Sequence, residues 1–270
     1  MPAIQPARLK TQVAELSGSF HQPALFVRQL HALLALYADR THRPGLSGAP
    51  APLTPAYFVP PPVLRQVVIQ LKPLVHSEAQ PALALCDALW AESYFECRSL
   101  AAALLGQVSP YPPDAILGRL ETWLEADLEN TIVHLTVLQG SVRLRSENLP
   151  SLLKIIPDWL AKPALQQSAL ILLQTLAGES SFNNLALIYR QIIPLLRKVN
   201  PILRPDLLTL LEELAHSAPQ ELTYVLRQAL EMADNPDTPS LIRQVMPSLP
   251  EELRQILKQA LQQRSGDSLS

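Results

Sequence analysis

The segment 82–106 limits what this chain can fold into more than any other stretch, because it holds two helix-length apolar patterns separated by a break at 91–93. The first arm repeats Leu85, Ala88 and Leu89 at three- and four-residue spacing, which gives a helix one apolar face. The second arm repeats the set Phe95, Leu100, Ala101, Leu104 and Leu105. A break this short folds the two helices into a hairpin. A hairpin cannot bury both faces alone, so further hairpins must stack on either side of it.

Further helical patterns precede and follow this hairpin. We expect helices at 4–17, 23–39, 61–75, 114–125, 128–139, 147–161, 164–177, 184–199, 203–217, 219–233, 240–247 and 251–263. Successive pairs begin about 35 to 40 residues apart, as in HEAT-type helical repeats. The hydrophobic fraction is 48% but the aromatic fraction only 5%, which favours helix over sheet. The sequence therefore predicts an all-α, right-handed HEAT-like α-solenoid of about five or six antiparallel helical pairs, since a closed bundle needs longer helices and a sustained heptad pattern.

The clearest interruption is the segment 41–62, which contains seven prolines and two glycines. Proline lacks a backbone donor and disfavours helix at the residue before it, so we expect this segment to be extended or disordered. Its first half favours disorder, whereas Tyr57, Phe58 and Val59 are apolar enough to dock across the helices. The predicted organisation is an N-terminal helical pair (1–40), a proline-rich linker (41–62), a HEAT-like repeat domain (63–264) and a polar tail (265–270).

Several classes of protein do not fit this composition. No apolar run is long enough to cross a bilayer, and the first residues lack the layout of a signal peptide, so we expect a cytoplasmic protein that does not engage a membrane. The net charge of −2 shows no general basic excess for nucleic acid. Cys86 and Cys97 lie on the two arms of the hairpin, where buried free thiols are favoured over a disulfide. Because no Cys/His cluster has metal spacing, we expect no metal and no cofactor.

The hairpin sequence LCDALWAESYFECRSLAAALLG resembles that of AlkD-type DNA alkylation repair glycosylases, which are HEAT-like repeat proteins. The matching positions are Leu89, Trp90, Ser93, Glu96, Arg98, Ala101 and Leu105. The likeness extends more weakly over about 57–233. The resemblance implies a DNA-binding solenoid that excises positively charged alkylated purines without flipping them into a pocket. In that family an aspartate stabilises the positive charge developing on the sugar, two tryptophans contact the lesion and an arginine holds the DNA backbone, all on the second helices that line the concave face.

The family's catalytic pattern is not found at its expected places. The helix at 128–139 starts without tryptophan, and the helix at 164–177 has no arginine. Trp123 and Asp127 have the family's Trp-x-x-x-Asp spacing, but Trp123 falls near the end of the preceding helix. They are the candidate catalytic pair, against the alternative that Trp123 packs in the core and Asp127 caps a helix.

The candidate nucleic-acid contacts are Arg98, Arg143, Arg145, Arg197 and Lys198. Each has a structural alternative: an ion pair with Glu96 or a packing contact between repeats for Arg98, and solvated turns or helix C-termini for the others.

Three functions remain open. The prediction is a non-catalytic scaffold that binds a protein partner through a concave face rich in Gln, Leu and Ser. The alternatives are a DNA-binding or DNA-repair protein whose turn arginines converge on one face, and an active alkylpurine DNA glycosylase that places Asp127 beside an aromatic side chain. Enzymatic activity is left open, with its absence favoured.

Overall fold

A computed structural model describes residues 5–39, 54–126, 128–232 and 237–267. For residues 232 and 265–267 it describes the backbone only. Within these ranges the chain is helical or connecting, and no strand occurs. The predicted all-α class is therefore confirmed, and the stacking described below is that of an α-solenoid. The right-handed coil and the assignment to HEAT-type repeats stay predictions.

The helices follow one another with short connections. They are α1 (Pro6–Ser17), α2 (Pro23–Tyr37), α3 (Pro61–Ser77), α4 (Ala79–Trp90), α5 (Phe95–Leu105), α6 (Asp114–Leu124), α7 (Asn130–Gly140), α8 (Val142–Glu147), α9 (Leu149–Ala161), α10 (Gln166–Gly178), α11 (Leu185–Arg197), α12 (Arg204–Ser217), α13 (Pro219–Met232), α14 (Asp237–Val245) and α15 (Glu251–Asp267), with 3₁₀ turns at Pro163–Leu165 and Met246–Ser248. Prolines open α1, α2 and α3, where the missing donor costs no helical hydrogen bond. The sequence patterns thus predicted nearly every helix.

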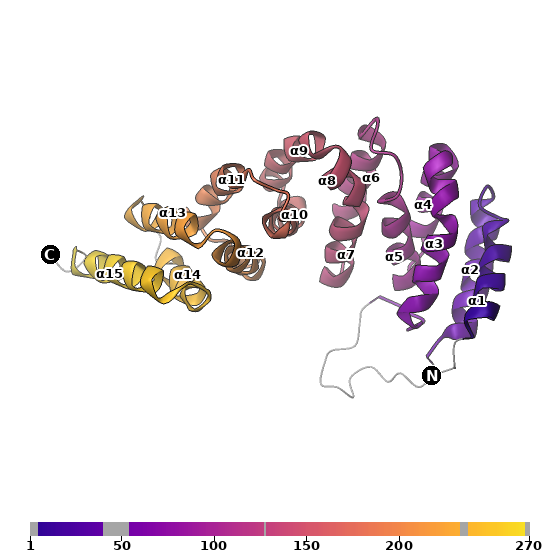
Figure 1. The fold of residues 1–270 in the computed structure, drawn as a ribbon, viewed down its shortest axis with the longest axis horizontal. Helices are drawn as coiled ribbons and strands as arrows, with labels where there is room; N and C mark the ends of the chain where they lie inside the picture. Colours follow the sequence, from indigo (N-terminus) through magenta and orange to yellow (C-terminus); the bar gives the residue numbers. More distant parts are fainter. Residues whose placement is uncertain (1–4, 40–53, 127, 233–236, 268–270) are drawn as a thin grey trace. The chain divides into compact units, whose positions relative to one another are not determined.

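The chain divides into two compact units, Met1–Ile155 and Ile156–Ser270, so that the division falls within α9. In the first unit α1, α3, α5 and α7 pack side by side as one row, and α2 packs on α4 in a second row (Figure 1). The predicted hairpin is formed by α4 and α5, whose apolar faces are fully buried at Leu85, Leu89 and Leu104. In the second unit the same two-row pattern recurs, with α10, α12 and α14 in one row and α11, α13 and α15 in the other.

Two glycines allow close packing at the ends of α5, α6 and α7 in the first unit. A Cβ placed on Gly106, which follows α5, would lie 1.8 Å from the carbonyl oxygen of Gln139 on α7. A Cβ on Gly140 would lie 2.7 Å from a side-chain carbon of Leu120 on α6. The end of α5 thus approaches the backbone of α7 directly, and the side chain of Leu120 on α6 packs against Gly140.

Candidate binding groove

A groove of about 690 Å³ runs over the row formed by α3, α5 and α7 in the first unit. Helix α5 provides its floor through Phe95, Ser99 and Ala103, which recur every four residues and therefore lie on one face of the helix. Gln107, two residues beyond the end of α5, continues this floor. The remaining lining residues are Thr54, Ala56, Phe58, Val59, Pro61, Leu64, Arg65, Val68, Ile69, Glu96, Leu100, Glu129, Thr131, Gln139 and Val142. Most of this surface is apolar, so the groove is suited to cover an apolar surface of a ligand.

The charged groups of the groove are concentrated at one end. Arg65 lies in the second turn of α3, Glu96 in the first turn of α5 and Glu129 just before α7. Further along these helices the lining is uncharged, and two apolar side chains are well exposed: Ile69, one turn after Arg65, at 57%, and Val142 on α8 at 38%. The groove is therefore polarised from a charged end to an apolar end.

One wall at the charged end is an extended segment, residues 54–60, which we call the strap. Its main anchor is Glu96, a carboxylate only 3% exposed, which accepts hydrogen bonds from the backbone N–H groups of Tyr57 at 3.0 Å and Val59 at 3.4 Å. Between these two residues Phe58 has a φ of +54°, an uncommon conformation for a non-glycine residue, and its ring lines the groove. The backbone strain is held in place by the two bonds to Glu96.

The strap is fastened at further points along its length. Phe95 donates its backbone N–H to the carbonyl of Pro55 at 2.8 Å, and Thr54 donates its N–H to Glu129 at 3.2 Å. The expectation that the second half of the proline-rich linker docks across the helices thus describes 54–60 correctly. Its first half, 41–53, lies outside the described residues.

An aromatic cluster holds the outer face of the strap. Tyr57 stacks on Tyr94 with ring centroids 4.7 Å apart, and its hydroxyl lies 2.9 Å from Nδ1 of His31 on α2. Nε2 of His31 lies 3.1 Å from the carboxylate of Glu92. Because a carboxylate without a proton can only accept, Nε2 of His31 donates to Glu92. Burial and the neighbouring Tyr94 raise the pKa of Tyr57 above its ordinary value of 10, so this hydroxyl remains a donor at neutral pH.

The part of the chain that forms the groove also matches a known protein family. The model of the DNA alkylation repair enzyme family matches residues 34–194, which is more than half of the chain and includes every residue of the groove. The chain belongs to the DNA alkylation repair enzyme family. Comparison with curated proteins and with solved structures gave no match. Membership of this DNA alkylation repair family fits the helical stacking and gives the groove a DNA-repair context.

Trp123, the tryptophan of the candidate pair, lies outside the groove. It is 5% exposed on α6 and stacks face to face on Trp90 of α4, with ring centroids 4.3 Å apart and planes inclined by 5°. Arg98 lies over the ring of Trp90, its guanidinium carbon 5.6 Å from the ring centroid, and donates to the backbone carbonyl of Glu92. Trp123 and Arg98 thus contribute to packing between α4, α5 and α6. Asp127, the other candidate, lies outside the described residues.

The structural alternative for Arg98 was partly wrong. An ion pair of Arg98 with Glu96 was expected, but Glu96 accepts from the strap and Arg98 bonds to Glu92 instead. The reason is that Glu96 points to the groove side of α5, where the N–H groups of the strap converge, whereas Arg98 points toward Trp90.

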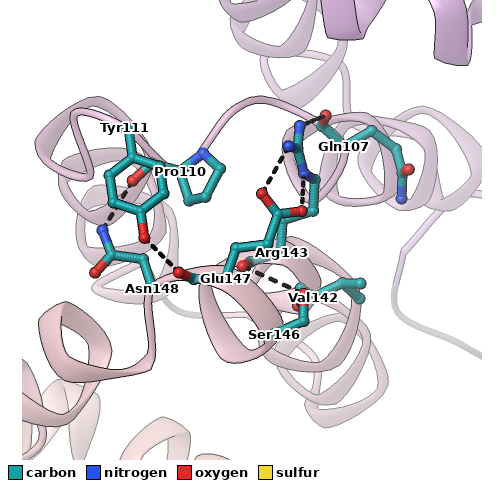
Figure 2. A network of polar contacts seen from close by, with 8 residues as sticks. All are labelled: Gln107, Pro110, Tyr111, Val142, Arg143, Ser146, Glu147 and Asn148. Carbon is teal, nitrogen blue, oxygen red and sulfur yellow. Dashed lines mark hydrogen bonds and ion pairs between the residues drawn. The ribbon is translucent and has the colours of Figure 1, made fainter.

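Arg143 and Arg145, two of the proposed phosphate contacts, lie on α8 and are engaged within the protein. Arg143 binds both carboxylate oxygens of Glu147, at 2.6 and 2.7 Å, and donates to the carbonyl of Gln107 at 2.9 Å (Figure 2). These hydrogen bonds from Arg143 lower the pKa of Glu147. Arg145 donates to the carbonyl of Leu138 at 2.9 Å.

The same network joins α8 to the connection before α6. Tyr111 donates its hydroxyl to the carbonyl of Glu147, and the buried Asn148 donates to the carbonyl of Pro110 at 2.9 Å (Figure 2). Arg143 is thus one element of a contact that fixes a loop.

Arg197 and Lys198, the other proposed contacts, belong to the second unit. Arg197 is the last residue of α11 and Lys198 follows it; both are exposed. Cations at a helix C-terminus interact favourably with its carbonyl groups, so this position has a structural reason of its own.

Sequence reasoning did not predict the groove. Arg65 was not singled out, and Phe58 and Phe95 were expected only to dock or to pack, although the four-residue repeat of Phe95, Ser99, Ala103 and Gln107 was visible in the sequence. In the part of the chain that the structure describes, no three His, Cys, Asp or Glu side chains are grouped to hold a metal. The same residues include no helix with the length and apolar character needed to span a bilayer.

Proposed function

We propose that this member of the DNA alkylation repair family is a non-catalytic protein that binds a segment of a protein partner in the α3/α5/α7 groove. The observation that supports this is the lining of the groove, where apolar side chains predominate and Arg65 is the one cation beside the carboxylates of Glu96 and Glu129. Gln107, Gln139, Leu64 and Leu100 supply the Gln and Leu character expected of a protein-binding face.

Electrostatics argue against a grip on duplex DNA by this surface. A protein that holds a duplex neutralises several phosphates with Lys and Arg, and each of these contacts contributes affinity through counterion release. The groove offers two carboxylates against one guanidinium, so a phosphate backbone lying in it meets no net attraction from side chains. Arg98, Arg143 and Arg145 already bind groups of the protein.

The test is a fluorescence-anisotropy titration of labelled duplex DNA, with and without an abasic-site analogue, at two salt concentrations. A parallel assay measures release of methylated purines from alkylated DNA. We expect neither salt-dependent binding nor purine release. Tight binding that falls steeply with salt, or release of methylated bases above the uncatalysed rate, would overturn the proposal.

A second candidate function, alkylpurine DNA glycosylase, is favoured by one arrangement in the same groove. The carboxylate of Glu129 lies beside the start of α7, and the rings of Phe58 and Phe95 line the same space. An anion stabilises an oxocarbenium-like transition state, and aromatic faces attract a cationic base. If purine release is detected, Glu129→Gln is expected to abolish it, while Glu15→Gln on the exposed face of α1 keeps full activity.

A further inference from the structure

The dimensions of the groove floor suit a short helix. The floor runs along α5 from Phe95 to Gln107, just beyond the end of the helix, and the 11 residues of α5 span about 16 Å. A partner helix of about 11 residues has the same length. Between the two ends the floor has the small side chains of Ser99 and Ala103, which allow another backbone to approach α5 closely.

The walls provide apolar contact on both sides of this floor. Leu64 and Val68 on α3 are one turn apart and both line the groove, and Val142 of α8 faces it from the other side. Ile69 and Val142 remain well exposed at the rim. An amphipathic helix that lays its apolar face into a groove covers surface of this kind.

The charged groups of the groove indicate which charge the partner carries and at which end of the groove that charge lies. Glu96 is bound to the N–H groups of Tyr57 and Val59, and Glu129 to that of Thr54. Arg65 is exposed, and the structure records no ion pair or hydrogen bond of its side chain with any described residue. The charged group left to complement is therefore a cation, which calls for an acidic side chain on the partner.

We infer that the groove receives an amphipathic α-helix of another protein, lying along α5 with an acidic side chain against Arg65. This inference rests on the proposed function and adds the conformation and charge of the partner. The ion pair between Arg65 and the acidic side chain of the partner chiefly fixes the orientation of the partner helix. The apolar contacts with α3, α5 and α8 supply most of the affinity.

The experiment uses the full chain and a displayed library of helical peptides of about 14 residues, with apolar residues at i, i+3, i+4 and i+7 and all other positions randomised. Enriched peptides are synthesised and titrated against the wild type. We expect a shared acidic residue at one end of the apolar face. Ala103→Trp, which fills the floor, should weaken binding at least tenfold, whereas Ala14→Trp on the exposed face of α1 leaves it unchanged.

A charge exchange tests the role of Arg65. Arg65→Glu should weaken the selected peptide about threefold to tenfold, and replacing the acidic residue of the peptide by Lys should restore binding to this variant. Arg8→Glu, an exposed charge reversal on α1, should change nothing. The inference is overturned if no peptide is enriched, if binding is unaffected by Ala103→Trp, or if the charge exchange restores nothing.

Two further outcomes separate this inference from the proposed function. Groove-dependent binding of extended, proline-containing peptides would overturn the helix while leaving a protein-binding function in place. A wild-type dimer that Ala103→Trp converts to a monomer would make a second copy of the chain the occupant. DNA binding in the anisotropy titration would instead overturn the proposed function itself.

Discussion

The absence of a side chain at Gly106 allows α5 and α7 to approach closely. A methyl group at this position would overlap the carbonyl of Gln139, which belongs to the backbone of α7 and cannot rotate away. Gly106→Ala should therefore lower the free energy of unfolding by about 2–3 kcal/mol, as in an overpacked core. The measurement is urea denaturation followed by circular dichroism.

Gly118, on α6, is the matched control, because a Cβ there has nothing within 4 Å. Gly118→Ala should stabilise the protein by about 0.5–1 kcal/mol, since alanine loses less backbone entropy in a helix. Equal effects of the two substitutions would contradict the close approach of α5 and α7.

The two cysteines are free, buried thiols, as the sequence analysis favoured. Burial, with the carboxylates of Glu92 and Glu96, raises the pKa of Cys97 to about 12, and burial also raises the pKa of Cys86. The native state therefore favours the neutral thiol. We expect neither cysteine to react with a disulfide reagent at pH 8 until the protein is unfolded in guanidinium; stoichiometric labelling of native protein would show that the thiols are accessible.

The same pKa shift has a consequence for stability. The pKa of Cys97 is higher in the folded state than in the unfolded chain, where it is about 9. The contribution of this thiol to the free energy of unfolding is therefore complete below pH 9 and is lost as the pH rises toward 12. The Cys97→Ala variant should therefore show a smaller loss of stability than wild type between pH 9 and pH 12, measured by urea midpoints. An identical pH dependence of the two proteins would contradict this role.

Single residues also show where sequence reasoning ends. That Trp123 packs in the core could be inferred from its place late in a helix, but its partner Trp90 could not, because the two are brought together by the packing of α4 and α6. Solvated turns or helix C-termini were the structural alternative for Arg143 and Arg145, but both lie half-buried on α8 and bind groups of Gln107, Glu147 and Leu138. The spacing of residues along the sequence does not show which side chains of different helices contact one another.

At the scale of elements, the apolar periodicity predicted helices well because each must bury a face against a neighbour. The helix α8 was missed because Val142–Glu147 is too short to show a period. The strap was foreseen only as a segment apolar enough to dock. Its actual attachment depends on Glu96, a carboxylate on another element, and on the unusual backbone of Phe58.

The strap depends on Glu96 for its order. Glu96→Ala removes the acceptor of the N–H groups of Tyr57 and Val59, and bonds to a charged group contribute about 1.5–3 kcal/mol each. We expect these amides to exchange with deuterium at least about tenfold faster, a factor equivalent to 1.4 kcal/mol. Hydrogen-exchange mass spectrometry of peptides covering 54–60 measures the change.

Glu15→Ala, on the exposed face of α1, is the control and should leave exchange of the strap unaltered. Unchanged exchange in Glu96→Ala would mean that Pro55, Tyr57 and Tyr94 hold the strap without the carboxylate.

At the scale of the whole molecule, the repeating hairpins were predictable but the groove was not. The sequence indicates which helices stack, whereas the groove needs the relative positions of α3, α5, α7 and a strap separated from them by loops. The net charge of −2 and the small number of basic residues on the second helices of the hairpins did indicate a surface poorly suited to DNA. Composition therefore yields an expectation about the class of partner, but it does not locate the groove.

The division into two compact units makes a prediction about how the molecule loses structure. Stacked repeats contact mainly their neighbours, so a defect in one unit is felt first by the helices next to it. Leu210 on α12 is fully buried in the second unit, and Leu210→Ala should cost about 2–5 kcal/mol. Hydrogen exchange should then accelerate in α10, α12 and α14, while α3, α5 and α7 keep their protection and the groove keeps its affinity for a selected peptide. Equal loss of protection in both units would show instead that the chain unfolds as one cooperative block.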